Sequence, residues 1–446
     1  RSPTVGSRIR SKAGETHNGQ ACSEGCPITA MNTAKTVVLV SQVFVPDSPS
    51  VGQHMFDLAR ELVGRGLRVI VFTPRRGYED PSVCFPKCEI REGVEIRRLP
   101  LCAFGKRSIP LRLLGGVSLV FQSMVRGVFV RGLTHLLITT VPPMSGLVAV
   151  WVKTFRRVRV VYWVMDLNPD QIIAAGKMRE DSWVAKFCAY ALRCTLRNSD
   201  RVVAMDRFMA ERLERKIPLE SKLLVIPPWP YEDQLADIPH SDNPFRRTHK
   251  LEDRFVVMYS GNITDVHPLN TLLEAIDRLR DDRGFVFVFI GASAARRKID
   301  AYAAERGLQN VLSLGYVPLE ETRFSLSAAD LHVVTMGDAM VGVVHPCKVY
   351  GIMSVGRPFL VIGPKKSHLG EILSSAPMGW QVEHGDVEGA VRVLREAHQL
   401  SPQKRQEIGA LGRQRVMAEF SRATLCSRFG DLFVPSIRER PGGDHG

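Results

Sequence analysis

Two series of short apolar segments, each alternating with amphipathic helical patterns, constrain the fold of this 446-residue chain more than any other feature. Alternation of this kind predicts mostly parallel sheets covered by helices on both faces. The strands expected in the first series lie at 35–44, 68–73, 94–99, 136–139, 158–164, 201–204 and 223–226. Those expected in the second series lie at 255–259, 285–290, 311–314, 331–335 and 359–362. We therefore expect an α/β protein with two facing Rossmann-like domains and a ligand cleft between them, outside the carboxyl ends of the strands.

A proline-rich and polar stretch separates the two series. Residues 227–230 read Pro-Pro-Trp-Pro, and the chain stays mostly polar as far as 253, which is typical of a linker between domains. We expect the final helix, near the end of the chain, to pack back on the N-terminal domain. The expected parts are a disordered tail (1–34), an N-terminal domain (35–228), a linker (229–253), a C-terminal domain (254–420) and the final helix with its tail (421–446).

The net charge of +14 is unevenly distributed. Residues 96–165 contain eleven Lys and Arg and no Asp or Glu, so this region should attract nucleic acid, an anionic membrane or a phosphorylated substrate. Between 106 and 131 the basic residues are mixed with leucine, valine and phenylalanine, a pattern that favours a membrane surface over nucleic acid. The alternative is a core helix whose exposed positions happen to be basic.

Two further features bear on location. The longest apolar region, 133–152, is broken by His135 and by Pro142-Pro143, so no segment is expected to span a bilayer. Nine cysteines are an odd number in a long chain, which favours a reducing compartment over a disulfide framework. These features and the basic region predict a cytoplasmic protein that binds the inner face of the membrane peripherally.

The segment 345–362 has the pattern of a polar loop, a short helix and a buried strand. Pro346 suits a helix start, Gly356 suits the position after a helix end, and 359–362 is apolar. With Lys348 in its first turn, this helix start is a candidate seat for a diphosphate. Loop amides near Gly52 and Gly261 could also approach phosphate oxygens, because glycine has no side chain. The alternative is an ordinary helix–strand step of an α/β fold.

Several motifs together make the chain resemble a family 4 glycosyltransferase of the GT-B fold, over about residues 35 to 435. The nearest subgroup is similar to the sugar transferases of bacterial polysaccharide and O-antigen assembly. The resemblance rests on the segments 41–47, 58–66, 92–98, 163–170, 259–262 and 345–362.

This resemblance implies retaining transfer of a hexose or N-acetylhexosamine from a nucleotide-diphosphate donor, with neither a metal nor another cofactor. It assigns the nucleotide to the C-terminal domain and the acceptor to the N-terminal domain. Asp166 matches the family position near the reacting sugar, where it would orient the sugar or stabilise positive charge at the anomeric carbon. Its alternative role is a helix cap or turn former. The expected donor-binding residues are Gly52, Gly261, Asn262, His267, Val343, His345 and Lys348.

The chain departs from the family pattern at two places. Val343 and Gly351 stand where the family usually has two glutamates, so another group must recognise the ribose. The loop 262–267 contains Asp265 where the family usually has Arg and Lys. His267 and His345 could compensate if they were protonated beside a phosphate; alternatively, they are loop histidines with ordinary hydrogen bonds.

The sequence therefore favours a glycosyltransferase that acts on a glycan or a polyprenyl-linked acceptor at the inner membrane face, with no nucleic-acid partner. One alternative is a nucleotide-sugar epimerase of the same architecture, although such an enzyme needs carboxylates for acid–base work. Another is a non-catalytic scaffold or binding protein on the GT-B fold.

Overall fold

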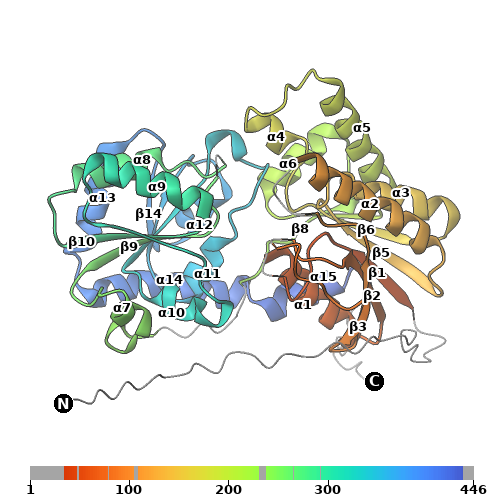
Figure 1. Cartoon of the computed structure of the whole chain (residues 1–446), viewed down its shortest axis with the longest axis horizontal. Helices are drawn as coiled ribbons and strands as arrows, with labels where there is room; N and C mark the ends of the chain where they lie inside the picture. Colours follow the sequence, from red (N-terminus) through yellow and green to blue (C-terminus); the bar gives the residue numbers. More distant parts are fainter. Residues whose placement is uncertain are drawn as a thin grey trace, which may run out of the picture. The chain divides into compact units, whose positions relative to one another are not determined.

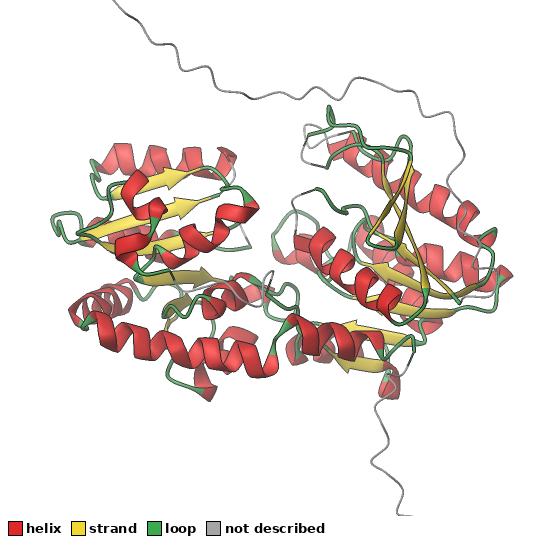
Figure 2. Cartoon of the chain, turned by 90° about the horizontal axis from the view of Figure 1, so that it is seen from below, coloured by secondary structure: helices red, strands yellow, loops and turns green. Residues whose placement is uncertain are grey.

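A computed structural model describes residues 35–47, 50–78, 80–104, 109–230, 238–264, 266–291 and 293–434. The expected tail at 1–34 and the residues after 434 lie outside these ranges, as does Asp265. The chain forms two sheets, and helices cover both faces of each (Figure 1, Figure 2). The α/β fold with two Rossmann-like domains is thereby confirmed.

The first sheet has eight strands in the order β3-β4-β2-β1-β5-β6-β7-β8. Every neighbouring pair is parallel except β3 and β4. Runs of buried β-branched residues explain the central strands, since a parallel strand is covered on both faces. The strands are β1 (Thr36–Val40), β2 (Arg68–Pro74), β3 (Cys88–Arg91), β4 (Val94–Leu99), β5 (Leu133–Thr139), β6 (Arg159–Trp163), β7 (Arg201–Ala204) and β8 (Leu223–Val225).

The helices of this half form two groups. Helices α2, α3 and α5 lie side by side, and α1 packs against α15, the helix near the end of the chain (Figure 1). Phe429 of α15 contacts Trp163 with ring centroids 4.6 Å apart, and Arg65, directly after α1, forms an ion pair of 2.8 Å with Asp431. The helices are α1 (Ser50–Gly64), α2 (Ile109–Val128), α3 (Gly146–Phe155), α4 (Asp170–Ala174), α5 (Trp183–Asn198), α6 (Arg207–Lys216) and α15 (Arg422–Gly430).

The second sheet has six parallel strands in the order β11-β10-β9-β12-β13-β14. They are β9 (Phe255–Ser260), β10 (Phe285–Ile290), β11 (Val311–Leu314), β12 (Leu331–Thr335), β13 (Phe359–Ile362) and β14 (Gly379–Val382). The helices are α7 (Pro244–Thr248), α8 (Asn270–Arg278), α9 (Ser293–Arg306), α10 (Thr322–Ser327), α11 (Lys348–Ser354), α12 (His368–Ser375), α13 (Val387–Gln399) and α14 (Pro402–Glu419). Short 3₁₀ turns complete the chain at Glu220–Lys222, His240–Asp242, Leu319–Glu321 and Asp338–Met340.

The strand order fixes where a ligand can bind. The chain reverses direction across the sheet between β1 and β5, and again between β9 and β12. At such switch points the loops after two neighbouring strands diverge and leave a crevice at the carboxyl edge. The segments after β5, β6, β9 and β12 are therefore the places to look for a site.

Two expectations about location can be compared with the structure. Among the described residues, no helix is both long enough and apolar enough to cross a membrane. Cys88 is disulfide-bonded, which the cysteine count did not lead us to expect. Six other described cysteines form no disulfide: Cys84, Cys102, Cys188, Cys194, Cys347 and Cys426.

Candidate active site

Asp166 lies three residues after the end of β6, at the carboxyl edge of the first sheet. Its backbone N–H donates to the hydroxyl of Thr140, which follows β5, at 3.1 Å. The next backbone N–H, that of Leu167, donates to the carbonyl oxygen of Val343 at 2.8 Å. The segment that carries Asp166 is thus held between the switch point of the first sheet and a loop of the second half.

The carboxylate of Asp166 has an unusual environment. Burial raises its pKa to about 6, and the charge of His345 opposes that rise. Among the described residues, no group hydrogen-bonds this carboxylate. The proposed alternative role as a side-chain cap finds no hydrogen bond to support it, and the carboxylate remains available to a ligand.

Lys348 is the first residue of α11, and its Nζ atom is buried although part of the residue is exposed. Among the described residues this Nζ has no hydrogen-bond partner; it lies 3.8 Å from the ring centroid of Tyr259 and borders Gly261. Burial lowers its pKa to about 7. A buried ammonium without a partner is costly, and a cation–π contact offsets only part of that cost. An anion beside Gly261 would supply the missing partner.

The helix begins two residues later than Pro346 led us to expect. Helix α11 begins at Lys348, after Pro346, and contains only seven residues. Seven residues give a weak macrodipole, because few peptide dipoles are aligned. The side chain of Lys348, rather than the helix end, is the main source of positive charge at this corner.

The loop after β9 brings three expected donor-binding residues to the same place. Gly261 has a positive φ of 131°, and the carbonyl oxygen of Asn262 accepts a hydrogen bond from the Tyr259 hydroxyl at 2.9 Å. His267 shares a hydrogen bond of 2.9 Å with the carbonyl oxygen of Thr335. Burial, together with the charge of Lys348, lowers the pKa of His267 to about 3, so this histidine is neutral and does not replace the missing Arg and Lys by its charge.

A cavity of about 500 Å³ lies beside this loop. Thr264 and His267 border it from the loop, and Asn270, Lys298 and Tyr302 border it from helices α8 and α9. Small-molecule sites commonly have volumes in this range.

The remaining expected donor-binding residues have protein partners. Both ring nitrogens of His345 are engaged, one with Asp206 at 2.7 Å and the other with the hydroxyl of Tyr350 at 2.9 Å. Val343 is buried and contributes its carbonyl oxygen to Leu167. Gly52 lies in α1, where a Cβ atom would come within 3.1 Å of the Phe44 backbone. Close packing explains this glycine, and no described contact joins it to the other six residues.

One cluster in the described part of the chain has metal-binding residue types: Asp206, His345 and His368, whose donor atoms lie within 4.8 Å of one another. The two imidazole rings are stacked, with centroids 3.9 Å apart and planes inclined by 20°. A metal bound to a ring nitrogen lies near the ring plane at about 2.1 Å. Nearly parallel rings do not direct two lone pairs to one such point, so we do not assign a metal to this cluster.

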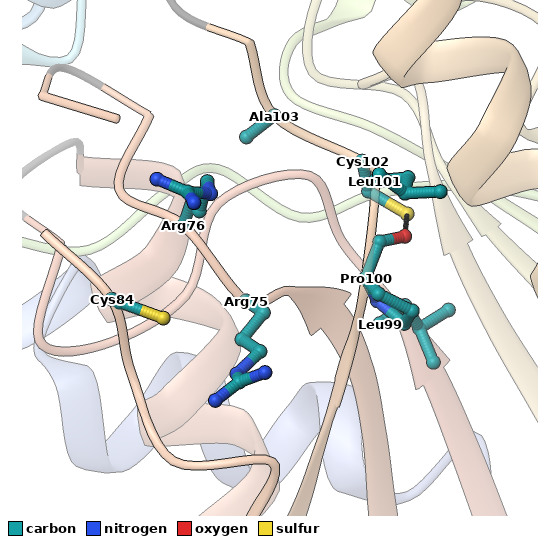
Figure 3. A pocket seen from close by; sticks show the side chains of 8 residues that line it. All are labelled: Arg75, Arg76, Cys84, Leu99, Pro100, Leu101, Cys102 and Ala103. Carbon is teal, nitrogen blue, oxygen red and sulfur yellow. Dashed lines mark hydrogen bonds between the residues drawn. The ribbon is translucent and has the colours of Figure 1, made fainter. Parts of the chain in front are cut away.

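A small cavity of about 180 Å³ lies at the carboxyl ends of β2 and β4 (Figure 3). Arg75 and Arg76 line one side, and the segment Leu99 to Ala103 lines another. Arg75 donates to the carbonyl oxygen of Phe85 and Arg76 to that of Pro81. Neither guanidinium forms an ion pair with a carboxylate of the described residues. This cavity gives the first sheet an additional pair of cations that a phosphate could use.

Sequence reasoning singled out Asp166 and Lys348 as candidate site residues but did not name Asp206, Tyr350 or the two arginines. Asp206 follows β7 and caps α6, with its side chain accepting from the Met209 N–H at 2.8 Å. Its position after a predicted strand was a usable signal, because functional side chains gather at carboxyl ends of parallel strands. Its contact with His345 was not predictable, since 139 residues separate the two.

Comparisons with known proteins show the family of the chain. A glycosyl transferase 4-like domain matches residues 51–229, and the model of the glycosyl transferases group 1 matches residues 241–415. The probable glycosyltransferase WbjE of Pseudomonas aeruginosa is 24% identical over 280 residues, which cover 62% of this chain and 69% of WbjE. The putative colanic acid biosynthesis glycosyl transferase WcaI of Escherichia coli is 26% identical over 245 residues, covering 54% of this chain and 60% of WcaI.

A solved structure shows the same fold. HepE of Anabaena, in complex with UDP and glucose, superposes with a TM-score of 0.66 at 14% identity, covering 89% of this chain and 98% of HepE. The resemblance to glycosyltransferases of polysaccharide assembly is confirmed. The chain therefore belongs to the glycosyltransferases, with a glycosyl transferase 4-like domain in its first half, a group 1 domain in its second half, and the GT-B fold.

Proposed function

We propose that this glycosyltransferase moves a sugar from a nucleoside-diphosphate donor to a glycan or polyprenyl-linked acceptor, with retention of configuration and without a metal or other cofactor. The observation that carries the proposal is the buried ammonium of Lys348 beside Gly261, which has no hydrogen-bond partner among the described residues. When the bond between the anomeric carbon and the diphosphate breaks, its electron pair leaves with the diphosphate. Lys348 would stabilise that negative charge, and the Asp166 carboxylate would stabilise the positive charge on the sugar.

The donor test is a thermal-shift panel of UDP, GDP, ADP and dTDP. UDP is the first candidate because HepE binds it. One nucleotide should raise the melting temperature of the unchanged protein and have no effect on Lys348→Ala, because a ligand at a hundred times its Kd stabilises by about 2.7 kcal/mol. Lys404→Ala, which removes an exposed lysine paired with Glu407, is the matched control and should respond like the unchanged protein. No shift with any nucleotide would contradict the proposed donor site.

The acceptor proposal rests on the first half of the chain. Arg75 and Arg76 line a cavity at the carboxyl edge of the first sheet and pair with no carboxylate of the residues that the structure describes. A phosphorylated acceptor would suit these cations, since arginine binds phosphate through two N–H groups at once. Transfer to a polyprenyl-diphosphate-linked sugar should therefore be weakened in Arg75→Gln by a higher KM for that acceptor, with the donor KM unchanged. An equal KM in both enzymes would reject this assignment.

We further propose that the protein binds the inner face of the membrane through helices α2, α3 and α5. These three neighbouring helices contain no Asp or Glu and carry exposed apolar side chains. Phe121 is 65% exposed and Trp183 is 79% exposed, whereas aromatic residues of this size are usually buried. A surface that combines exposed aromatic residues with Lys and Arg suits an anionic lipid surface. Other members of the surface are Leu113, Leu114, Val117, Trp151, Phe155, Phe187 and Tyr190.

Vesicle sedimentation tests this surface. The unchanged protein should sediment with phosphatidylglycerol-containing vesicles at low salt, and less so at high salt. Trp183→Ser combined with Phe121→Ser should weaken sedimentation at least fivefold, whereas Met417→Ser, which removes an exposed apolar side chain of α14, should not. Absence of sedimentation at low salt would reject the membrane proposal while leaving the donor proposal intact.

A further inference from the structure

Residues of the first half hold the loop that leads to Lys348. The Leu167 N–H donates to the carbonyl oxygen of Val343 at 2.8 Å, and Arg212 donates to that of Val341 at 2.7 Å. Gly342 packs on the start of α6 so closely that a Cβ atom would lie 2.5 Å from the carbonyl oxygen of Phe208. Its φ of 69° also favours glycine. Residues 341–343 are therefore fixed against α6 and the segment after Asp166.

A further contact between the two halves runs through Asp206. One carboxylate oxygen accepts the N–H of Met209 and so caps α6, and the other is bonded to Nδ1 of His345 at 2.7 Å. The Nε2 atom of His345 shares a hydrogen bond of 2.9 Å with the hydroxyl of Tyr350, a residue of α11. This chain of hydrogen bonds joins the end of β7 in the first half to the helix that begins with Lys348.

The surroundings of Asp206 keep its carboxylate ionised. Burial alone would raise its pKa, but the hydrogen bond from His345 and the charges of His345 and His368 outweigh it and lower the pKa to about 2. His368 stacks on His345, and its Nδ1 lies 3.7 Å from the same carboxylate oxygen. All three side chains are buried. A buried charge-assisted hydrogen bond of this kind is strong and sensitive to geometry.

We propose that Asp206 is a positioning residue: through His345 and Tyr350 it sets the loop 341–348 so that Lys348 and Asp166 act on the same donor. This inference rests on the proposed roles of Lys348 and Asp166. The groups expected to hold the diphosphate, Lys348 and Gly261, both belong to the second half, whereas Asp166 belongs to the first. Loss of Asp206 should therefore disturb their alignment more than it disturbs diphosphate binding.

Hydrogen exchange of the full chain tests the positioning directly and needs no substrate. In Asp206→Ala, the amides of Leu167, Val343 and Val344 should exchange at least tenfold faster than in the unchanged protein. Asp206→Asn should lie in between, because asparagine still caps a helix well. The matched control is Asp386→Ala, which removes a carboxylate that caps α13 by the same type of bond at 2.8 Å. The control should leave these three amides unchanged.

Kinetics separate a positioning role from a purely structural one. With UDP-glucose as the probe donor and a polyprenyl-diphosphate-linked sugar as the acceptor, Asp206→Ala should transfer glucose at least tenfold more slowly at saturation, whereas its Kd for UDP should change less than threefold. Unchanged exchange at Leu167 and Val343 would overturn the inference. The inference would also be overturned if Asp206→Ala lost UDP affinity and turnover in parallel. It would be overturned, too, if Zn²⁺ raised the melting temperature of the unchanged protein but not that of His368→Ala. If the unchanged protein bound none of the nucleotides, the proposed function would fail while the exchange comparison still decided the role of Asp206.

Discussion

Two buried cations of the second half, Arg246 and Lys348, differ in their hydrogen-bond partners. Arg246 is 2% exposed, and it donates to Asp330 at 3.1 Å and to the carbonyl oxygens of Ala328, Leu251 and Arg254. The Nζ atom of Lys348 is also buried and lies against the ring of Tyr259, but it has no hydrogen-bond partner in the described part of the chain. The first arrangement joins α7 to the sheet, which is a structural task. The second leaves a charge without a partner at the place where a diphosphate is expected.

The largest expected effect follows from removing the satisfied cation. Arg246→Met should lower the free energy of unfolding by about 3–5 kcal/mol, because it leaves the buried Asp330 carboxylate short of a partner. Urea unfolding measures this loss. Arg247→Met, at the exposed neighbouring position, should change the free energy of unfolding by less than about 0.5 kcal/mol. Similar losses in both variants would erase the contrast between the two cations.

Removing the cation without a hydrogen-bond partner, Lys348, should raise the free energy of unfolding instead of lowering it. Lys348→Met keeps the volume of the side chain and removes a buried charge, so we expect stabilisation by about 1–4 kcal/mol. Because the pKa is lowered from 10.5 to about 7 in the folded state, the gain should be full below pH 7, and it should shrink as the pH rises from 7 towards 10.5, where the unfolded lysine also loses its proton. Urea unfolding at pH 6 and pH 9 checks this. A loss of stability at both values would mean that Lys348 has a structural partner.

Asp166 provides the anionic counterpart of this comparison. Its pKa is raised from 3.8 to about 6, so the ionised carboxylate destabilises the fold above pH 6, and this penalty disappears as the pH falls through about 4. Asp166→Asn should therefore gain about 1–2 kcal/mol at pH 8 and nothing at pH 4. The same variant should lose at least tenfold in turnover. Unchanged turnover with any detected donor would remove Asp166 from the site.

The smallest effect is expected for an exposed pair that also joins the two halves. Arg207 of α6 pairs with Glu371 of α12, and both side chains are about half exposed. Solvent screens such pairs, so Glu371→Gln should change the free energy of unfolding by less than about 0.5 kcal/mol. It should also leave the exchange of the loop 341–345 unaltered. An effect as large as that of Asp206→Ala would show that surface charge, and not the buried hydrogen bond, holds the loop.

The contrast between local and distant interactions explains what the sequence could predict. Apolar runs such as 36–40 and 285–290 identified central strands, because a buried parallel strand must be apolar over its whole length. Strand β3 was missed because Cys88–Arg91 is short, polar and partly exposed at the sheet edge. Lys348 was found from its local Pro-Cys-Lys setting. The burial of its Nζ and the contact of Asp206 with His345 depend on segments far apart in the sequence, so no local pattern could reveal them.

The most direct measurement of the central claim is the pKa of Lys348 itself, followed by NMR of the ¹⁵N-labelled Nζ atom and assigned by its absence in Lys348→Met. In the free protein this group should titrate at about 7, well below the 10.5 of an ordinary lysine. On saturation with the nucleoside diphosphate that stabilises the protein, the pKa should rise by at least one unit, because the diphosphate favours the charged form. A pKa near 10.5 that no nucleotide changes would contradict the account.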